Sequence, residues 1–313
     1  MYSLSWWSSR EVGRELALPQ RHRELEQTLK IKSLGWHPTL PDAMDMNPAD
    51  QSGHDTHPLA LTGERTLPDV ADERYWFERH VVAYELAADV IGQERGRRRR
   101  GPLTALDAGC GEGYGLARLR AAGADRVVGV DLDPPTVAHA RARYAAGDDH
   151  LEVLEAELTD LPLADAEVAA CVSFQVIEHL HDIPGYLREL RRVTHRDGTI
   201  VISTPNRLTF TPNADTPVNP FHTREFSPKE LREELTSAGL TVRWLAGIHH
   251  GASLLAEQAA LGIDLLATLT TTPPDEWPDE VRALVHRVES RMFDVHDSDL
   301  DASLDLIAVC GPS

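Results

Sequence analysis

The chain has 313 residues, of which 42% are hydrophobic, and this is long enough for one large α/β domain with appended segments. Its formal net charge of −19 argues against a nucleic-acid partner, because a protein that binds phosphates needs a basic surface. No stretch approaches the about 20 consecutive apolar residues of a membrane span. The three cysteines have neither metal-site nor disulfide spacing, which favours a reducing, cytoplasmic location.

The first part of the chain divides into two segments. Residues 1–57 mix Trp, Pro, His and Asp without a sustained period, so we expect a disordered N-terminal extension. Residues 58–100 form a leading segment whose stretch Glu73–Gln93 has the pattern of an amphipathic helix. One domain is then expected to cover residues 58–313.

The most informative run is Ala105-Leu-Asp-Ala-Gly-Cys-Gly-Glu-Gly-Tyr-Gly115. Apolar residues before it predict a buried first strand, and a helical pattern follows from Leu116 to Ala122. Glycine at positions 109, 111 and 113 allows a tight turn and lets a ligand lie directly against the backbone. The run therefore predicts a nucleotide-type site at the carboxyl end of a strand.

The spacing of this run excludes two common nucleotide motifs. It lacks the Gly-Lys-Ser/Thr of a P-loop, and its Gly-x-Gly-x-Gly spacing differs from the dinucleotide fingerprint. Asp107 and Glu112 would repel a pyrophosphate but suit a ligand that carries an ammonium or sulfonium group. The run resembles motif I of the class I S-adenosylmethionine-dependent methyltransferases. This resemblance implies that the cofactor contacts Asp107, Gly109, Cys110, Gly111 and Gly113.

Three later segments fit the same family. Val127–Asp131 is a short β-branched run that ends in an acid, and a carboxylate there can bind both ribose hydroxyls. Alternatively, Asp131 only caps the next helix. The resemblance places Leu132 against the adenine, and Glu157 with the Leu158 backbone at the adenine amino group. Val168–Phe174 reads as a buried strand, and Gln175 after it is assigned to the cofactor site.

Residues that could reach the methyl acceptor lie in three places. The leading helix offers Tyr75, His80 and Tyr84, the last two of which share a helical face; an aromatic packing stripe is the alternative. Asn206 ends the fifth strand, and His222 lies in the polar loop that follows. We predict these five residues as acceptor contacts.

The loop after the fourth strand carries the predicted catalytic residues, Glu178 and His179. A sugar hydroxyl is a very weak acid, so it needs a general base, a role that suits histidine, or a metal ion. Ubiquinone-pathway and small-RNA methyltransferases carry Glu-x-x-Glu-His here, and in the RNA enzymes a later histidine completes a divalent-cation site. Three residues match that set and are candidate ligands for Mg²⁺: Glu178, His179 and His222. Gln175 stands where the first glutamate of the motif would be. A metal-assisted mechanism, a metal-free histidine base and a purely structural pair all stay open.

The expected fold is α/β: a Rossmann-like, seven-stranded, mostly parallel sheet with helices on both faces. Residues 101–206 would form the cofactor half, and 207–313 would supply an acceptor loop, extra helices and the last strands. Within 251–292 the pattern predicts two helices split by Thr272-Pro-Pro-Asp, which form a C-terminal helical insertion, and Ser303–Cys310 predicts a final strand.

A narrower resemblance starts near residue 60 and runs to the end of the chain. The combination includes Tyr-Trp-Phe-x-Arg-His (75–80), Phe-Gln-Val-Ile-Glu-His-Leu (174–180), Ser-Thr-Pro-Asn-Arg (203–207) and Asn-Pro-Phe-His-Thr-Arg-Glu (219–225). It is similar to actinobacterial methyltransferases linked to methylated glucose or mannose polysaccharides. This implies an S-adenosylmethionine-dependent O-methyltransferase that acts on a sugar or oligosaccharide in the cytoplasm. The alternatives are a small-molecule O- or N-methyltransferase of secondary metabolism and a non-catalytic cofactor-binding protein.

Overall fold

The computed structural model describes residues 66–97, 101–212, 214 and 216–313. These residues belong to one compact unit, His37–Ser313. The predicted extension, residues 1–57, lies outside the described residues and stays a prediction.

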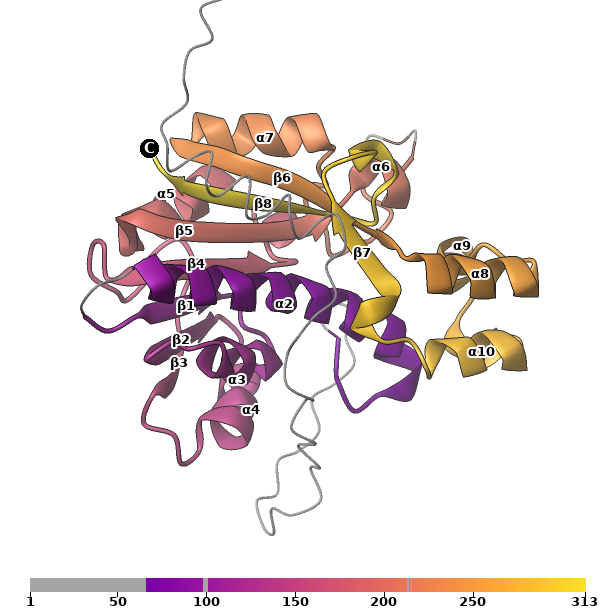
Figure 1. Ribbon diagram of the computed structural model, residues 1–313, viewed down its shortest axis with the longest axis horizontal. Helices are drawn as coiled ribbons and strands as arrows, with labels where there is room; N and C mark the ends of the chain where they lie inside the picture. The colour runs from indigo at the N-terminus through magenta and orange to yellow at the C-terminus, as the bar shows by residue number, and fades with distance from the viewer. Residues whose placement is uncertain (1–65, 98–100, 213, 215) are drawn as a thin grey trace, which may run out of the picture. The chain divides into compact units, whose positions relative to one another are not determined.

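One mixed sheet organises the described part of the chain (Figure 1). Its eight strands lie in the order β3-β2-β1-β4-β5-β8-β6-β7. The first five in this order pair in parallel, whereas β8 is antiparallel to both β5 and β6, and β7 is antiparallel to β6. The strands are β1 (Thr104–Ala108), β2 (Arg126–Asp131), β3 (Leu151–Glu155), β4 (Val168–Phe174), β5 (Thr194–Pro205), β6 (Leu240–His250), β7 (Phe293–His296) and β8 (Asp305–Pro312).

The prediction of seven strands was wrong by one. The additional strand, β7, extends the edge of the sheet by pairing Gly247–His250 of β6 with Phe293–His296. Its four residues, Phe-Asp-Val-His, are too short and too polar for their alternation to stand out from a loop.

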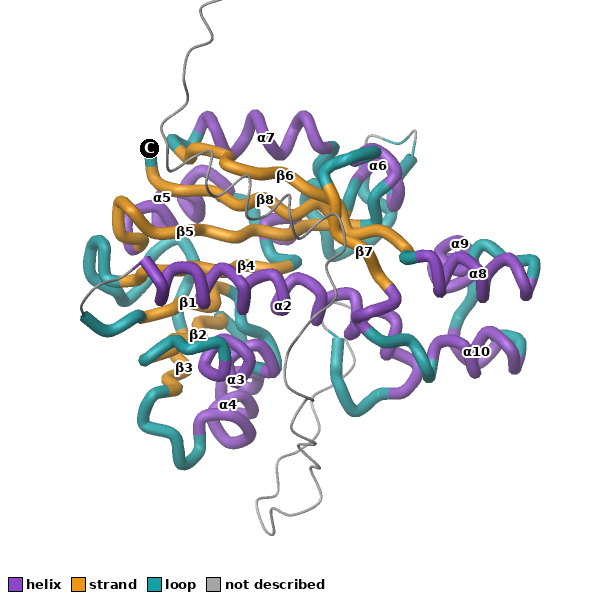
Figure 2. Tube along the Cα trace, in the orientation of Figure 1, coloured by secondary structure: helices purple, strands orange, loops and turns teal. Residues whose placement is uncertain are grey.

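Helices cover both faces of the sheet (Figure 2). The leading helix α2 and the helices α3 and α4 pack on one face, and α5 and α7 pack on the other, over the apolar residues of β1, β2, β4, β5 and β8. The helices are α2 (Arg74–Arg97), α3 (Tyr114–Ala121), α4 (Pro134–Ala140), α5 (Ile183–Val193), α6 (Arg207–Phe210), α7 (Pro228–Ser237), α8 (Ala252–Leu261), α9 (Leu265–Thr271) and α10 (Asp279–Val285).

The insertion between β6 and β7 contains three helices, α8, α9 and α10, rather than the predicted two. Gly262 ends α8 in a left-handed conformation, φ +65°, and Asp264 caps α9, so a continuous apolar pattern is split at this turn. In the described part no single helix is long and apolar enough to span a membrane. The pair α8 and α9, bent by 71° where the two helices meet, reaches the length and apolar composition of a span only when both helices are counted together.

Two features of this fold bring the candidate residues together. The parallel strands β1 to β5 all end at the same edge, so the loops after them converge there. Because β8 runs in the opposite direction, its first residue, Asp305, pairs with Pro205 and lies at that same edge.

Candidate functional site

The glycine run after β1 has the geometry of a ligand-binding turn. Gly109 has φ +84°, and a Cβ there would lie 2.4 Å from Val176 Cγ2, so this position requires glycine. The backbone N–H groups of Gly109 and Cys110 donate to the Val130 carbonyl, which ties the turn to β2. A Cβ on Gly111 would meet no atom within 4 Å, so the backbone there borders open space. Gly113, φ +100°, packs against Ala140 of α4.

Asp107 lies beneath this turn and is fully buried. The Tyr84 hydroxyl donates to its Oδ2 at 3.0 Å, and Oδ1 has no hydrogen-bond partner among the described residues. Burial raises the pKa of this carboxyl to about 7, with a smaller contribution from Asp131. A cationic group placed beside Oδ1 would therefore satisfy an otherwise costly buried acid.

The side chain of Asp131 organises the neighbouring loop. Its Oδ2 accepts from Gly111 N at 2.9 Å and its Oδ1 from Asp133 N at 3.0 Å. The N-cap of α4 is Asp133, which accepts from Thr136 N, so Asp131 is not the capping residue. Leu132 is 55% exposed beside it, as an apolar wall for a ring would be.

The remaining predicted cofactor residues surround this point. Ala156 N donates to the Asp131 carbonyl, which brings the loop of exposed Glu157 and buried Leu158 next to β2. Cys110 is buried, and its Sγ would lie 2.9 Å from a Cβ on Gly129, so the thiol fills the space that Gly129 leaves. The structure therefore gathers the predicted residues of β1, β2 and β3 at one edge; their contacts with a ligand stay a prediction.

Gln175 differs from this group. It has φ +56°, a strained value for a residue other than glycine, and its Nε2 donates to Ser203 Oγ at 3.3 Å and to Asp305 Oδ1 at 3.4 Å. The amide is thus directed toward β5 and β8. Asp305 is fully buried and forms an ion pair with Arg79 of α2 at 3.0 Å.

Arg79 and Asp305 are not among the residues that the sequence predicts for the site. Asp305 interrupts the apolar run of the predicted strand Ser303–Cys310, and Arg79 is a charged residue among the buried residues of α2. A charged residue inside a buried pattern is unusual unless it is paired, and that signal could have identified both.

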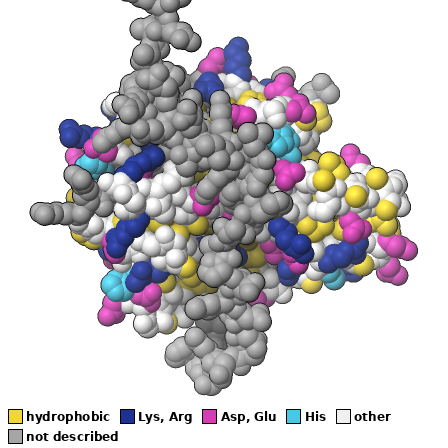
Figure 3. All heavy atoms as spheres, in the orientation of Figure 1, with side chains coloured by type: hydrophobic (Ala, Val, Ile, Leu, Met, Phe, Trp, Pro, Cys, Tyr) yellow, Lys and Arg dark blue, Asp and Glu magenta, His cyan; other side chains and the backbone are white. Residues whose placement is uncertain are grey.

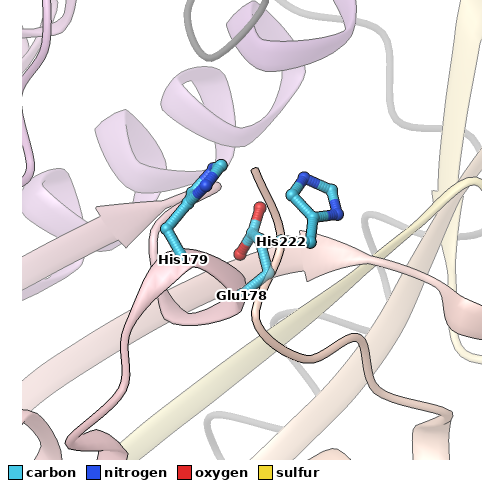
Figure 4. Close-up of side chains that lie close together, drawn as sticks. All are labelled: Glu178, His179 and His222. Carbon is cyan, nitrogen blue, oxygen red and sulfur yellow. The ribbon is translucent and has the colours of Figure 1, made fainter. Parts of the chain in front are cut away.

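Glu178, His179 and His222 come together in space, as predicted (Figure 4). One possible ligand atom from each lies within 4.8 Å of the other two. Glu178 and His179 belong to the short turn Ile177–His179 after β4, and His222 comes from the loop after β5. Thr223 N donates to the Glu178 carbonyl at 2.7 Å, which holds the two loops against each other.

Glu178 is fully buried in this cluster. Thr204 Oγ1 donates to its Oε2 at 3.0 Å, and its Oε1 has no hydrogen-bond partner in the described part of the chain. Burial raises the pKa of Glu178 to about 8, and the nearby Asp305 and Glu225 add to the rise. An orphaned buried carboxylate oxygen beside two imidazoles fits a cation or an acceptor proton.

His179 and His222 meet edge to face, with ring centroids 4.9 Å apart and an angle of 82°. A carbonyl only accepts, so His179 Nδ1 donates to the Phe221 carbonyl at 3.0 Å, and its lone pair is on Nε2. In an octahedral or tetrahedral site with metal–ligand bonds of about 2.1 Å, neighbouring ligand atoms lie about 3.0–3.4 Å apart, so separations of up to 4.8 Å in this cluster would have to shorten for it to hold an ion.

Two predicted acceptor residues have structural roles instead. Tyr75 is completely buried: its hydroxyl hydrogen-bonds to His250 Nε2 at 2.6 Å and its ring packs on Phe293. Asn206 is also buried; its Nδ2 donates to the Leu300 and Ser303 carbonyls, and its Oδ1 caps α6. Both side chains are fully engaged within the fold, which contradicts their prediction as acceptor contacts.

His80 and Tyr84 lie on one face, as predicted, but that face meets the glycine turn. His80 Nδ1 is 3.2 Å from the Tyr114 hydroxyl, and Tyr84 bonds to Asp107. Burial and the nearby Arg79 lower the pKa of His80 to about 3, so the ring is neutral at physiological pH. These two side chains therefore lie beside the glycine turn, and their contact with an acceptor stays a prediction.

Comparisons with known proteins agree with this geometry. Residues 106–202 match the family model described as "Methyltransferase domain". A "Probable S-adenosylmethionine-dependent methyltransferase" of Mycobacterium tuberculosis (strain H37Rv) is 43% identical over 269 residues, which cover 84% of this chain and 93% of the relative. Another from Mycolicibacterium smegmatis is 44% identical over 257 residues, covering 80% and 94%.

More distant matches share less of the chain. A malonyl-[acyl-carrier protein] O-methyltransferase of Serratia marcescens is 35% identical over 134 residues, 41% of this chain and 50% of that protein. Among solved structures, the geranyl diphosphate C-methyltransferase of Streptomyces coelicolor aligns over 73% of this chain and 77% of its own, with 17% identity and a TM-score of 0.49. The identity and coverage of the mycobacterial relatives show that this chain belongs to the class I S-adenosylmethionine-dependent methyltransferases.

Proposed function

We propose that this enzyme transfers the methyl group of S-adenosylmethionine to a hydroxyl of a sugar or oligosaccharide in the synthesis of a methylated polysaccharide in the cytoplasm. The observation that carries the proposal is the cluster of Glu178, His179 and His222 at the carboxyl edge of the sheet, beside the glycine turn. A hydroxyl acceptor needs such a group, because it must lose its proton during the transfer.

The cofactor would lie along the turn at Gly111, where the backbone borders open space. Asp131 would hold the ribose hydroxyls, and the buried Asp107 would favour the cationic methionine end. When bound, S-adenosylmethionine supplies a methyl group that is already strongly electrophilic. The protein then has to align the attacking oxygen in line with the methyl–sulfur bond and exclude water.

The histidines would help to remove the proton from the acceptor hydroxyl. His179 keeps its lone pair on Nε2, because the Phe221 carbonyl fixes the proton on Nδ1. In the metal-free version this nitrogen takes the proton from the acceptor hydroxyl. In the metal-assisted version Glu178, His179 and His222 would hold a divalent cation such as Mg²⁺, which lowers the pKa of the hydroxyl. The orphaned Oε1 of Glu178 is compatible with both.

The surroundings of the cluster support a neutral, ring-shaped acceptor. Phe221 is 42% exposed directly beside His179, and an exposed aromatic face can stack on a sugar ring. On the face that Figure 3 shows, the described Lys and Arg side chains are interspersed with Asp and Glu, without a basic patch. Together with the net charge of −19, this favours an uncharged glycan over nucleic acid.

The decisive experiment is mass spectrometry of methyl transfer from S-adenosylmethionine to a panel of gluco- and manno-oligosaccharides, with and without EDTA. We expect one methyl group on at least one glycan and loss of the product with His179→Ala. Glu94→Gln is the matched control, because Glu94 is a buried carboxylate that accepts a hydrogen bond from Thr199 near the middle of β5, five residues before Thr204. Transfer only to phenols, amines or carboxylates would overturn the sugar assignment. Cofactor binding without turnover on any acceptor would overturn catalysis itself.

A further inference from the structure

The structure contains a buried carboxylate next to the cluster that the proposed function does not use. Glu225 is 3% exposed, and its Oε1 lies 2.7 Å from Nδ1 of His222. Its Oε2 has no hydrogen-bond partner among the described residues, and His222 is the one ion-pair partner recorded for it there. Burying a carboxylate this deeply costs free energy unless a partner compensates it, and His222 is the partner that the structure provides.

A second contact defines the protonation state of the His222 ring. Asn219 Nδ2 lies 3.0 Å from His222 Nε2, and Asn219 Oδ1 accepts from Phe221 N at 3.0 Å. The second bond fixes which end of the amide is oxygen, so Nδ2 is the donor and Nε2 must carry the lone pair. The ring proton is then on Nδ1, where it is donated to Glu225. The two contacts agree on one tautomer.

The backbone around this pair is anchored on both sides. Thr223 N donates to the Glu178 carbonyl at 2.7 Å, and Phe226 forms an isolated bridge with Asn206 at the end of β5. Glu225 therefore lies between two anchored positions, and His222 directly precedes the first of them.

We propose that Glu225 is the positioning residue of His222: it holds the ring in the Nδ1–H tautomer and directs the Nε2 lone pair into the cluster with Glu178 and His179. The Asn219 amide occupies the position at Nε2 that the acceptor hydroxyl or a cation takes when the site is filled. In the metal-assisted version of the proposed function this nitrogen needs its lone pair to bind the cation, and in the metal-free version it would accept a hydrogen bond from the acceptor. A carboxylate behind a histidine is the usual means of presenting such a lone pair. The inference rests on that proposed function, but the tautomer can be measured without any acceptor.

The first test is long-range ¹H–¹⁵N NMR of the full chain labelled with ¹⁵N-histidine, recorded at pH 8 without acceptor. The resonances of His222 are identified by their loss in His222→Asn. We expect the wild type to show a protonated Nδ1 and an unprotonated Nε2, and Glu225→Ala to shift both signals toward a mixture of tautomers. An Nε2–H tautomer in the wild type would overturn the proposal even if every variant failed to fold. Unchanged signals in a folded Glu225→Ala would do the same.

The second test uses the glycan that the acceptor panel identifies. If a metal joins the cluster, Glu225→Ala should lower kcat about 10- to 100-fold, the usual effect of removing a partner that orients a functional histidine. If His179 acts without a metal, Glu225→Ala should mainly raise the KM for the glycan. In both cases the affinity for S-adenosylmethionine should not change. Glu225→Gln should retain part of the activity, because its amide oxygen can still accept from Nδ1, and Glu94→Gln should behave like the wild type. Wild-type values of both kcat and the glycan KM in Glu225→Ala would overturn the positioning role. The predicted tautomer without methylation of any glycan would instead overturn the proposed function and leave this inference standing.

Discussion

Replacement of Asp107 by Asn should stabilise the cofactor-free enzyme above neutral pH while weakening cofactor binding. The Asp107 carboxyl is fully buried, accepts one hydrogen bond from Tyr84 and has a pKa raised from 3.8 to about 7. Such a group contributes stability while it is protonated, and this contribution is lost as the pH rises through its folded-state pKa. Wild type should therefore lose stability relative to Asp107→Asn between about pH 4 and pH 7, with a plateau above.

The size of the effect follows from the shift. Three pKa units correspond to about 4 kcal/mol, of which about 3 kcal/mol falls between pH 5 and pH 8. The amide that replaces the orphaned Oδ1 leaves a buried donor without a partner, at a cost of about 1–3 kcal/mol at every pH. The net gain above pH 7 is then about 1–3 kcal/mol, or a Tm increase of roughly 2–10 °C for a domain of this size.

Urea unfolding of the cofactor-free protein at several pH values from 5 to 8.5 measures this difference, and calorimetry measures the affinity for S-adenosylmethionine. Tyr84→Phe serves as the companion variant, because it removes the single hydrogen bond to the carboxylate and should destabilise the protein most above pH 7. A stability difference between wild type and Asp107→Asn that does not change with pH would refute the reasoning. Equal cofactor affinity would remove Asp107 from the binding site.

Three further predictions concern the cofactor, the N-terminal segment and the cluster. Asp131→Asn should weaken binding of S-adenosylmethionine by about 1.5–3 kcal/mol in calorimetry, and near-native affinity would exclude the ribose assignment. A chain that begins at Pro58 should keep the activity and Tm of the full chain, whereas a large loss of either would give residues 1–57 a role. His179→Ala should lower turnover by about 10²–10⁴-fold with little change in cofactor affinity, and near-normal turnover would remove His179 from the mechanism. If a metal joins the cluster, His222→Ala should lower turnover nearly as much, and EDTA should abolish the activity of the wild type. If His179 acts as a base without a metal, EDTA should have no effect on activity.

Local pattern was sufficient for the cofactor half of the fold. The predicted strand 168–174 coincides with β4, and the acid at the end of β2 is Asp131, as the β-branched run before it indicates. Consecutive β-α units place successive loops at one edge of a parallel sheet, so order along the chain already implies proximity in space. For the same reason the meeting of Glu178 and His179 with His222 could be predicted from their places after β4 and β5.

The residues that were misassigned or missed depend on contacts between distant segments. Tyr75 and Asn206 have the composition of acceptor-site residues, yet Tyr75 is buried against β6 and β7 and Asn206 holds the segment before β8. Arg79 and Asp305 are separated by more than two hundred positions and form a pair only because β8 inserts antiparallel beside β5.

The sequence by itself determined the strands of the cofactor half, the glycine turn and the identity of the clustered residues, because these depend on local periodicity and on the regular alternation of strands and helices along the chain. The tertiary structure alone decided the direction of each side chain. It turned Gln175 toward Asp305, and it placed Glu225 behind His222. A side chain's direction depends on which neighbours exclude water and supply hydrogen bonds, and those neighbours come from segments that the chain brings together only on folding.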